Sequence, residues 1–386
     1  MAARISFDST VGEKTRKSVF EWVKSRKWLD KPQRKIGESV FGPTPPNVFV
    51  GEYNYPNVFA GPLVSLEEKP IDSPVDLYGL NYDAIIQSRI SLVRGMERRN
   101  VKAPFEKAFE IATSINQPDI ETTFKKPIEF SLTFSSLHQP SGPSGEIKKF
   151  EIAGNPVIPA KIDEIVAEKL KVREALPELM EEFDYHYIQK ILTAGVLGEE
   201  RKLVPTKWGI TATDRMVADE FLKEVKQNSH IVQPTIYSNN YLFNHFEILL
   251  LPGAWEFEQF ESWEPDNDQQ QGTDISHEYE PYWGRSDYAK TEGGGYYAGR
   301  HGVAEALNIL RKQARCVIFR EVNENYTIPV GVFEVRENVR NAFRKQPTKC
   351  TTLNEALEIL KTRLKQPMHK YLKQSRILTQ KTLGEY

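Results

Sequence analysis

The stretch of sequence that decides the fold is CVIFREVNENYTIPVGVFEV, residues 316–335. Two apolar runs, Cys316 to Val322 and Ile328 to Val335, lie on either side of Asn323–Asn325. Asparagine side chains favour turns, and short runs rich in β-branched and aromatic residues favour strands. The stretch therefore predicts two strands joined by a turn.

Helices are predicted on both sides of these strands. Apolar residues at helical spacing indicate an amphipathic helix from Val303 to Ala314, and a short helix is expected to begin at Glu337. In the last predicted helix leucines fall on one side, and Pro367 ends it because proline lacks the amide donor that a helix needs. Those leucines are Leu353, Leu357, Leu360 and Leu364.

The rest of the chain mixes strand and helix patterns without an internal repeat. Residues 127–134 (PIEFSLTF) and 147–153 (IKKFEIA) alternate with period two, which predicts a hairpin. Without regular βαβ alternation, the mixture favours an α+β fold with mixed or antiparallel sheets and packed helices. The other expected elements are helices over Asp83 to Arg99 and most of Pro159 to Ile191, and central strands over Val204 to Ile210 and Phe246 to Leu251.

Composition narrows the class of protein. The 386 residues carry 51 Lys and Arg against 53 Asp and Glu, which excludes a uniformly basic nucleic-acid-binding protein but not a local basic face. No apolar run is long enough to cross a membrane and the first residues lack a signal peptide's apolar segment, so we expect a cytoplasmic protein with no membrane partner. Only Cys316 and Cys350 occur, without a CxxC, so no zinc site is expected.

Positive charge gathers near both ends of the sequence. Residues 14–36 hold nine Lys or Arg with Trp22 and Trp28 interleaved, which indicates a basic, partly helical arm. From Lys361 to Lys381 there are seven Lys or Arg and no acid. Both segments are candidates for contact with nucleic-acid phosphates.

The last residues contain a spaced triplet. Gln380, Leu383 and Tyr386 stand at i, i+3 and i+6, so that one helical turn presents an aliphatic and an aromatic side chain on the same side. The triplet resembles the clamp-interacting (PIP) box, which implies the sliding clamp (PCNA) as a partner. That box usually ends in two aromatics, whereas only Tyr386 is present here, so weak binding is expected from this segment alone.

An acidic segment raises the question of a metal site. Residues 255–287 hold ten acids, with Arg285 as the sole base. Oxygen-rich clusters bind Mg²⁺ or Mn²⁺, and paired metals can activate water against a phosphodiester. Asp274, His277 and Glu278 are the candidate ligands for that chemistry. The alternative, which the sequence favours because the spacing matches no metal motif, is a solvated acidic loop.

A glycine run supplies a candidate phosphate site. Gly293–Gly295 can form a loop whose amides receive a phosphate at the start of the next helix, with Arg300, Arg311 and Arg315 neutralising the DNA backbone. The rival interpretation is a tight turn with two tyrosines packed into the core.

A second candidate DNA contact lies in the PTKW turn, residues 205–208. Lys207 precedes Trp208, whose ring can stack on an unpaired base. A buried tryptophan beside an exposed lysine is the alternative that the sequence favours. The arginines and glutamates around the 316–335 stretch are expected to form structural ion pairs, namely Arg320, Glu321, Glu334, Arg336, Glu337 and Arg340.

Four unusual strings together resemble the archaeal Nre family of DNA-repair proteins. They are PNVFVGEYNYPNVFAGPL (46–63), LVPTKWGITATD (203–214), GRSDYAKTEGGGYYAGR (284–300) and FREVNENYTIPVGVFEVRENVR (319–340). The resemblance implies a role in DNA-damage repair and a clamp-binding box at the end, which falls on Gln380, Leu383 and Tyr386. One branch of the family carries an N-terminal cysteine-rich zinc motif, which this chain lacks because no cysteine precedes Cys316.

The resemblance and the charge distribution together suggest an organisation for the chain. We expect a basic arm (1–40), an N-terminal Nre region (41–290), a C-terminal Nre region (291–366) and a basic tail (367–386), with the two Nre regions forming one compact unit. The leading hypothesis is a DNA-repair protein that binds PCNA and contacts DNA. A metal-dependent enzyme acting on damaged DNA (nuclease or glycosylase-like) and an interaction scaffold without DNA contact are the alternatives.

Overall fold

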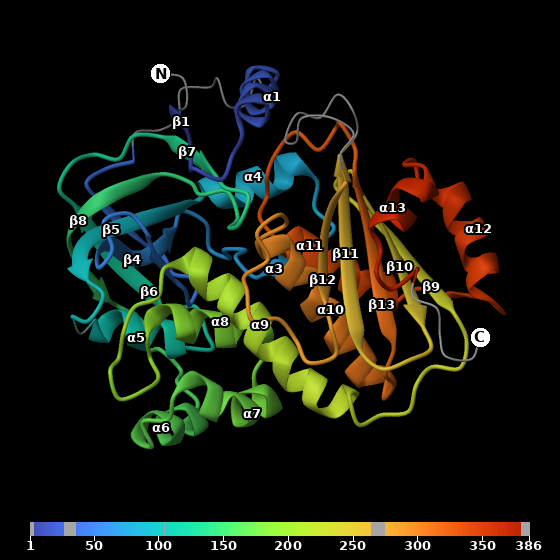
Figure 1. Cartoon of the computed structure of the whole chain (residues 1–386). Coiled ribbons are helices and arrows are strands. Elements are labelled where there is room, and N and C mark those ends of the chain that lie inside the picture. Colours follow the sequence, from blue (N-terminus) through green and yellow to red (C-terminus); the bar gives the residue numbers. More distant parts are fainter. Residues whose placement is uncertain (1–3, 27–35, 104, 264–274, 380–386) are drawn as a thin grey trace. The chain divides into compact units, whose positions relative to one another are not determined.

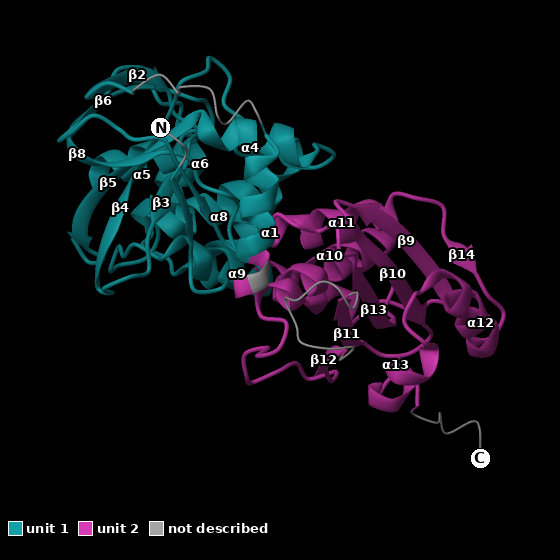
Figure 2. Ribbon diagram, turned by 90° about the horizontal axis from the view of Figure 1, so that it is seen from above, with its two compact units in different colours: residues 1–11, 16–216, 329–331 teal, residues 12–15, 217–328, 332–386 magenta. Residues whose placement is uncertain are grey.

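The computed structural model describes residues 4–26, 36–103, 105–263 and 275–379. The chain divides into two compact units (Figure 2). Unit 1 comprises residues 1–11, 16–216 and 329–331, and unit 2 comprises residues 12–15, 217–328 and 332–386. The main division falls within one helix, between Met216 and Val217.

Unit 1 is built on a six-stranded mixed sheet with the strand order β2-β6-β8-β5-β4-β3. Neighbouring strands are antiparallel except β5 and β8, which are parallel, and β1 and β7 form a separate parallel pair. The strands are β1 (Arg4–Phe7), β2 (Ser39–Pro43), β3 (Val48–Val50), β4 (Asn57–Ser65), β5 (Leu92–Asn100), β6 (Asp119–Phe124), β7 (Ser131–Phe134) and β8 (Ser144–Ile152).

Helices complete unit 1, and their ends follow local capping rules. The α8 helix begins where Asp184 accepts a hydrogen bond from the Tyr187 amide at 2.7 Å. It ends at Gly195, whose φ of 69° and whose approach to the Lys202 carbonyl both require a residue without a side chain. The helices are α1 (Glu13–Lys24), α3 (Pro74–Leu77), α4 (Tyr82–Ile90), α5 (Glu106–Thr113), α6 (Ala160–Ala167), α7 (Val172–Glu182), α8 (Tyr185–Ala194) and α9 (Thr206–Val225), which continues into unit 2.

Unit 2 contains a second six-stranded mixed sheet with the order β12-β11-β13-β10-β9-β14. Here β11 and β13 are parallel and the other neighbours are antiparallel. The strands are β9 (Thr235–Tyr241), β10 (Asn244–Leu251), β11 (Glu256–Trp263), β12 (Ser276–Glu280), β13 (Arg315–Val322) and β14 (Thr348–Lys349), and the helices are α10 (Gly294–Leu310), α11 (Phe333–Phe343), α12 (Leu353–Arg363) and α13 (Met368–Gln374).

The helices of unit 2 cover both faces of its sheet, with α10 and α11 on one face and α12 and α13 on the other (Figure 1). On the second face, Leu249 and Phe319 of the sheet pack with Leu360 of α12 and Tyr371 of α13 in one apolar core. Burying this apolar area is the main force that holds the layers together. The expected α+β fold with mixed sheets and packed helices is confirmed.

Several predicted elements are confirmed where the periodicity is strong. The run from Phe246 to Leu251 lies in β10, and that from Cys316 to Val322 lies in β13. The helical stretch from Pro159 to Ile191 forms α6, α7 and α8, and the leucine-lined helix is α12. It is not the last helix: α12 ends at Arg363, and Pro367 precedes a further helix, α13.

The predicted hairpin of residues 127–134 and 147–153 is wrong, although both segments contain strands. The β7 strand pairs with β1, and β8 pairs with β5 and β6. Period-two alternation identifies a strand and its buried face, but the partner is chosen by the fold as a whole.

The predicted helix from Asp83 to Arg99 is wrong in its second half. The α4 helix ends at Ile90, and β5 begins at Leu92 and pairs with β4. A Cβ atom on Gly61 would lie 2.3 Å from the carbonyl oxygen of Gly95, so the missing side chain of Gly61 lets these strands approach closely.

Two further predicted strands are wrong, because a helix begins within each of these runs. Val204 to Ile210 contains the start of α9 at Thr206, because a short apolar run does not distinguish a strand from a buried helix. In the run from Ile328 to Val335, helix α11 begins at Phe333. Before it, Gly331 has a φ of 92° and lies so close to the His138 backbone that a Cβ atom would stand 2.6 Å from its carbonyl carbon.

Candidate functional site

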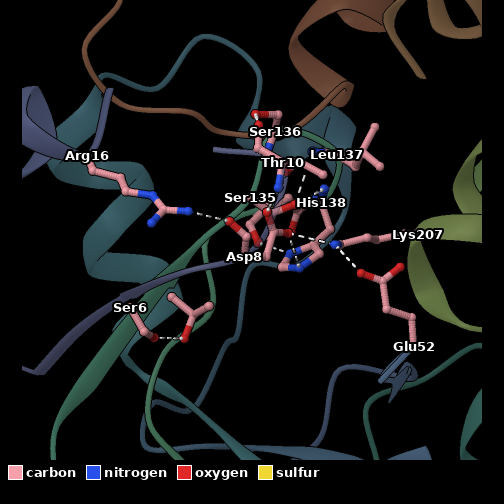
Figure 3. A network of polar contacts seen from close by, with 12 residues as sticks. Ser6, Asp8, Thr10, Arg16, Glu52, Ser135, Ser136, Leu137, His138 and Lys207 are labelled. Atoms are coloured by element: carbon pink, nitrogen blue, oxygen red, sulfur yellow. Dashed lines mark hydrogen bonds and ion pairs between the residues drawn. The ribbon is translucent and has the colours of Figure 1, made fainter. Parts of the chain in front are cut away.

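A network of charged side chains lies inside unit 1 and centres on Lys207, at the start of α9 (Figure 3). The Lys207 Nζ atom is 2.8 Å from Asp8 Oδ2 and 2.6 Å from Glu52 Oε1. The side chains of Lys207 and Asp8 are only 8 % and 6 % exposed. The lysine therefore neutralises two carboxylates, one of them buried.

Asp8 is held in its charged form by several partners. Its Oδ1 atom accepts a hydrogen bond from the Thr10 amide at 2.8 Å, and the Thr10 hydroxyl donates to the same atom. Burial alone would raise the pKa of Asp8, but Lys207, Ser135 and Thr10 outweigh burial and hold that pKa below its usual range.

His138 lies next to this ion pair as a neutral imidazole. Its Nε2 atom is 3.9 Å from Asp8 Oδ2, and its Nδ1 atom is 2.6 Å from the Gln139 carbonyl oxygen. Burial lowers the pKa of His138 to about 4. At neutral pH the ring is uncharged, and Nδ1–H donates to the carbonyl.

The network joins three segments that are distant in the sequence. Asp8 follows β1, Glu52 lies in the turn between β3 and β4, and Lys207 lies in the first turn of α9. The Val50 amide also donates to the Thr206 hydroxyl at 2.9 Å, which fixes the same turn to the helix. These contacts therefore also position the residues that follow, namely Tyr55 in the turn and Trp208 on the helix.

Trp208 and Tyr55 follow these anchored positions and face the outside. Their ring centroids are 5.1 Å apart, and the residues are 47 % and 41 % exposed. The alternative that the sequence favoured, a buried tryptophan beside an exposed lysine, is wrong because Lys207 is the buried residue. Trp208 is available for stacking, whereas Lys207 is occupied by two carboxylates.

A second buried ion pair in unit 1 was not predicted from the sequence. Asp72 Oδ1 lies 2.7 Å from Arg89 Nη1, and Asp72 Oδ2 accepts a hydrogen bond from Asn47 at 2.8 Å. The His186 Nε2 atom is 3.8 Å from the same carboxylate oxygen. Asp8 and Asp72 were missed because no local pattern marks an isolated aspartate as buried.

In unit 2 the described part of the acidic segment consists mainly of β11 and β12, and most of the glutamates of these strands are buried and paired. Glu280 Oε2 is 2.7 Å from Arg300 Nε, Glu261 Oε2 is 2.5 Å from Arg320 Nη1, and Glu278 Oε2 is 2.6 Å from Arg285 Nη1. The interpretation of this segment as a solvated loop is wrong for β11 and β12. The interpretation failed because the arginines that neutralise these glutamates lie mainly later in the sequence.

The candidate metal ligands occupy different surroundings. Asp274 lies outside the described residues, and Glu278 accepts hydrogen bonds from Thr291 besides its ion pair with Arg285. His277 stacks on Phe260 with ring centroids 4.6 Å apart, and its Nε2 atom is 3.3 Å from Glu258 Oε1. In the part of the chain that the structure describes, no three His, Cys, Asp or Glu side chains gather as metal ligands.

The predicted DNA-contacting arginines are also separated by the structure. Arg300 is 5 % exposed and bound to Glu280 and Asp219, and Arg315 is 9 % exposed and bound to Glu256 at 2.7 Å. Arg311 is exposed at the end of α10. Of the three guanidinium groups, only that of Arg311 is presented to solvent.

The glycine run combines features of both predicted interpretations. Gly293 caps α10 with a φ of 53°, so the run does lie at a helix start. Tyr296 and Tyr297 are buried, as in the interpretation of tyrosines packed into the core. Two of the expected structural ion pairs around α11 are confirmed, because Arg320 lies 3.3 Å from Glu334 and Arg340 lies 2.9 Å from Glu337.

Gln380, Leu383 and Tyr386 lie outside the described residues, but the segment before them is firmly held. Glu258 accepts hydrogen bonds from the Ser375 hydroxyl at 2.5 Å and from the Ile377 amide at 3.1 Å. Ile377 and Leu378 are buried in the core of unit 2. The chain is therefore fixed to within two residues of Gln380.

No helix among the described residues is long and apolar enough to span a membrane. No solved structure matches the chain.

Comparison with known proteins places the chain in a family. The profile described as archaeal Nre, N-terminal, matches residues 16–267, and the profile described as archaeal Nre, C-terminal, matches residues 280–386. The chain is 33 % identical to DNA repair protein NreA of Archaeoglobus fulgidus, over 84 % of this chain and 85 % of that protein. It is 30 % identical to DNA repair protein NreB of the same organism, over 92 % and 94 % of the two chains. It is 31 % identical to DNA repair protein NreA of Haloferax volcanii, over 83 % and 82 %. Matches of this extent in both halves show that the chain belongs to the archaeal Nre family.

Proposed function

We propose that this protein acts in DNA repair, bound to the sliding clamp (PCNA) through Gln380, Leu383 and Tyr386 and in contact with DNA. The observation that carries the repair role is the likeness to NreA and NreB, which are named DNA repair proteins and align over most of both chains. The proposal for the clamp rests on the spacing of the three residues, which suits a helical turn inserted into an apolar pocket.

Two structural observations support this arrangement. The core of unit 2 holds the chain as far as Leu378, so a partner that binds residues 380–386 is tethered close to a folded surface. Of the predicted DNA contacts, Trp208 and Arg311 have exposed side chains. Tethering raises the local concentration of DNA at such weak contacts.

Deletion of residues 380–386 tests the clamp contact. We expect the deletion to abolish clamp binding measured by calorimetry, and Leu383→Ala or Tyr386→Ala to weaken it about tenfold or more, because each removes an apolar anchor. The melting temperature of the free protein should not change.

Matched controls lie between the anchors. Thr382→Ala and Glu385→Ala alter the same segment without touching the triplet, and clamp affinity should stay within about threefold of the wild type in both. Full clamp affinity in the truncated chain would show that the tail is not the docking element.

A further inference from the structure

Unit 1 exposes several aromatic side chains on segments that adjoin the Lys207 network. Trp208 and Tyr55 lie with their ring centroids 5.1 Å apart, and Phe59 on β4 is 40 % exposed. Aromatic side chains are normally buried, so a group of exposed ones marks a binding surface.

The strand register places further side chains on the β4–β5 pair, which continues from the turn of Tyr55. Asn57 stands opposite Asn100, and Phe59 stands opposite Arg98, so these four side chains share one face of the sheet. The side-chain amide of Asn100 donates to the Asn57 side-chain oxygen at 3.1 Å. The backbone amide of Val101 donates to the Pro56 carbonyl at 2.9 Å. The pairing therefore reaches the turn that carries Tyr55. We call this surface the aromatic strip: Tyr55, Asn57, Phe59, Arg98, Asn100 and Trp208.

The positive charge of the strip is carried by Arg98, whose guanidinium group can bind a phosphate. Arg98 is exposed and forms no ion pair with any residue in the described chain. Its neighbour Arg99, by contrast, lies 3.2 Å from Glu97 and covers the Phe105 ring. The nearby Glu52 carboxylate is bound to Lys207. A phosphate near Arg98 thus meets an unpaired guanidinium group.

The neighbouring rings of Tyr55 and Trp208 are held in place before any ligand arrives. Trp208 follows Lys207, and Tyr55 shares its turn with Glu52, so the 2.6 Å contact between Lys207 and Glu52 ties the two ring-bearing segments together. Rings that are already positioned lose little conformational entropy on binding.

We propose that the aromatic strip binds single-stranded DNA, with bases stacked on Trp208, Tyr55 and Phe59 and a phosphate on Arg98. This inference rests on the proposed role in DNA repair. Exposed rings interleaved with amides and a free cation suit unpaired bases, each of which offers a flat face to a ring. A duplex hides those faces in its base stack and fits the strip less well.

Fluorescence anisotropy with a labelled oligo(dT) strand tests the stacking. Trp208→Ala and Tyr55→Ala are each expected to weaken binding about fivefold or more, as loss of one base–ring stack does. Trp208→Phe keeps a ring and should retain most of the affinity. The control is Trp283→Ala, which removes a tryptophan that is 89 % exposed in unit 2 and should bind like the wild type.

Two further probes separate stacking from phosphate attraction. An abasic strand of equal length and the matching duplex should both bind more weakly than oligo(dT), because neither offers unpaired bases. Arg98→Ala should reduce the slope of log affinity against log salt by about 0.7, the value for one phosphate contact on a single strand. Arg173→Ala, an exposed arginine on α7 of the same unit, should leave that slope unchanged.

The inference is overturned if Trp208→Ala and Trp283→Ala bind oligo(dT) equally well, or if the abasic strand binds as tightly as oligo(dT). Clamp affinity of Trp208→Ala should equal that of the wild type. Failure of the strip therefore leaves the clamp proposal standing, and failure of the 380–386 deletion test leaves the strip standing.

Discussion

At the scale of single residues, the central feature is a buried lysine that joins segments far apart in the sequence. Lys207 is in contact with Asp8 and Glu52, and its own side chain is 8 % exposed. Removing one partner of a buried pair leaves an uncompensated charge, which costs far more than an exposed pair contributes. The lysine is therefore expected to matter for stability as well as for the position of Trp208.

Lys207→Met is expected to lower the free energy of unfolding by about 3 kcal/mol, because Asp8 then stays buried without its cation. Urea unfolding followed by circular dichroism measures the loss. The control is Lys223→Met, in which the lost lysine is 64 % exposed and pairs with Glu220 along the helix, so the change should stay within about 0.5 kcal/mol. Equal effects of the two substitutions would contradict the role assigned to Lys207.

At the scale of elements, the close packing of α10 depends on residues without side chains. A Cβ atom on Gly302 would lie 2.7 Å from Val339 Cγ1 and 3.0 Å from Val339 Cβ, on helix α11. These Val339 atoms are close to the Val339 backbone, so they cannot move aside unless helix α11 moves with them. Gly302 is thus required for the contact between α10 and α11, although glycine weakens a helix by itself.

Gly302→Ala is expected to destabilise the protein by about 1–2 kcal/mol, because overpacking against Val339 exceeds the gain in helix propensity. Thermal unfolding by calorimetry measures this. Gly12→Ala serves as the control, since a Cβ atom there would meet nothing within 4 Å. An increase in stability for Gly302→Ala would show that the two helices can move apart at little cost.

At the scale of the whole molecule, two buried groups give the two units opposite responses to acid. In unit 1, burial lowers the pKa of His138 from 6.5 to about 4. Between pH 6.5 and pH 4 the unfolded chain therefore binds more protons than the folded chain, so acid weakens unit 1. In unit 2, burial raises the pKa of Glu334 from 4.5 to about 7. Between pH 7 and pH 4.5 the folded chain therefore binds more protons than the unfolded chain, so acid strengthens unit 2.

Between pH 7 and pH 5, we therefore expect the urea midpoint of unit 1 to fall and that of unit 2 to rise. Hydrogen exchange followed by mass spectrometry resolves the two, with peptides from β8 and from β13. His138→Asn should remove the fall and Glu334→Gln the rise, while substitution of the exposed His369 by Asn should change neither. A parallel shift of both midpoints in the wild type would contradict the assignment.

The sequence by itself determined the elements whose periodicity is strong and whose environment is uniform. The α12 leucines and the apolar β10 and β13 runs specify their own buried faces, because side-chain period and backbone geometry are local properties. Four strings of the sequence also identify the Nre family. The ion pairs of Arg320 with Glu334 and of Arg340 with Glu337 join residues close in sequence and could be predicted.

Only the tertiary structure decided which strands pair and which charges are buried. The second half of the predicted helix at Asp83 to Arg99 becomes β5 because β4 and β8 provide partners on both sides. Lys207 is buried and Trp208 exposed because Asp8 and Glu52 supply carboxylates from distant segments. A charged side chain can be buried only where the fold places an opposite charge beside it. That pairing depends on distant segments, so no local pattern in the sequence predicts it.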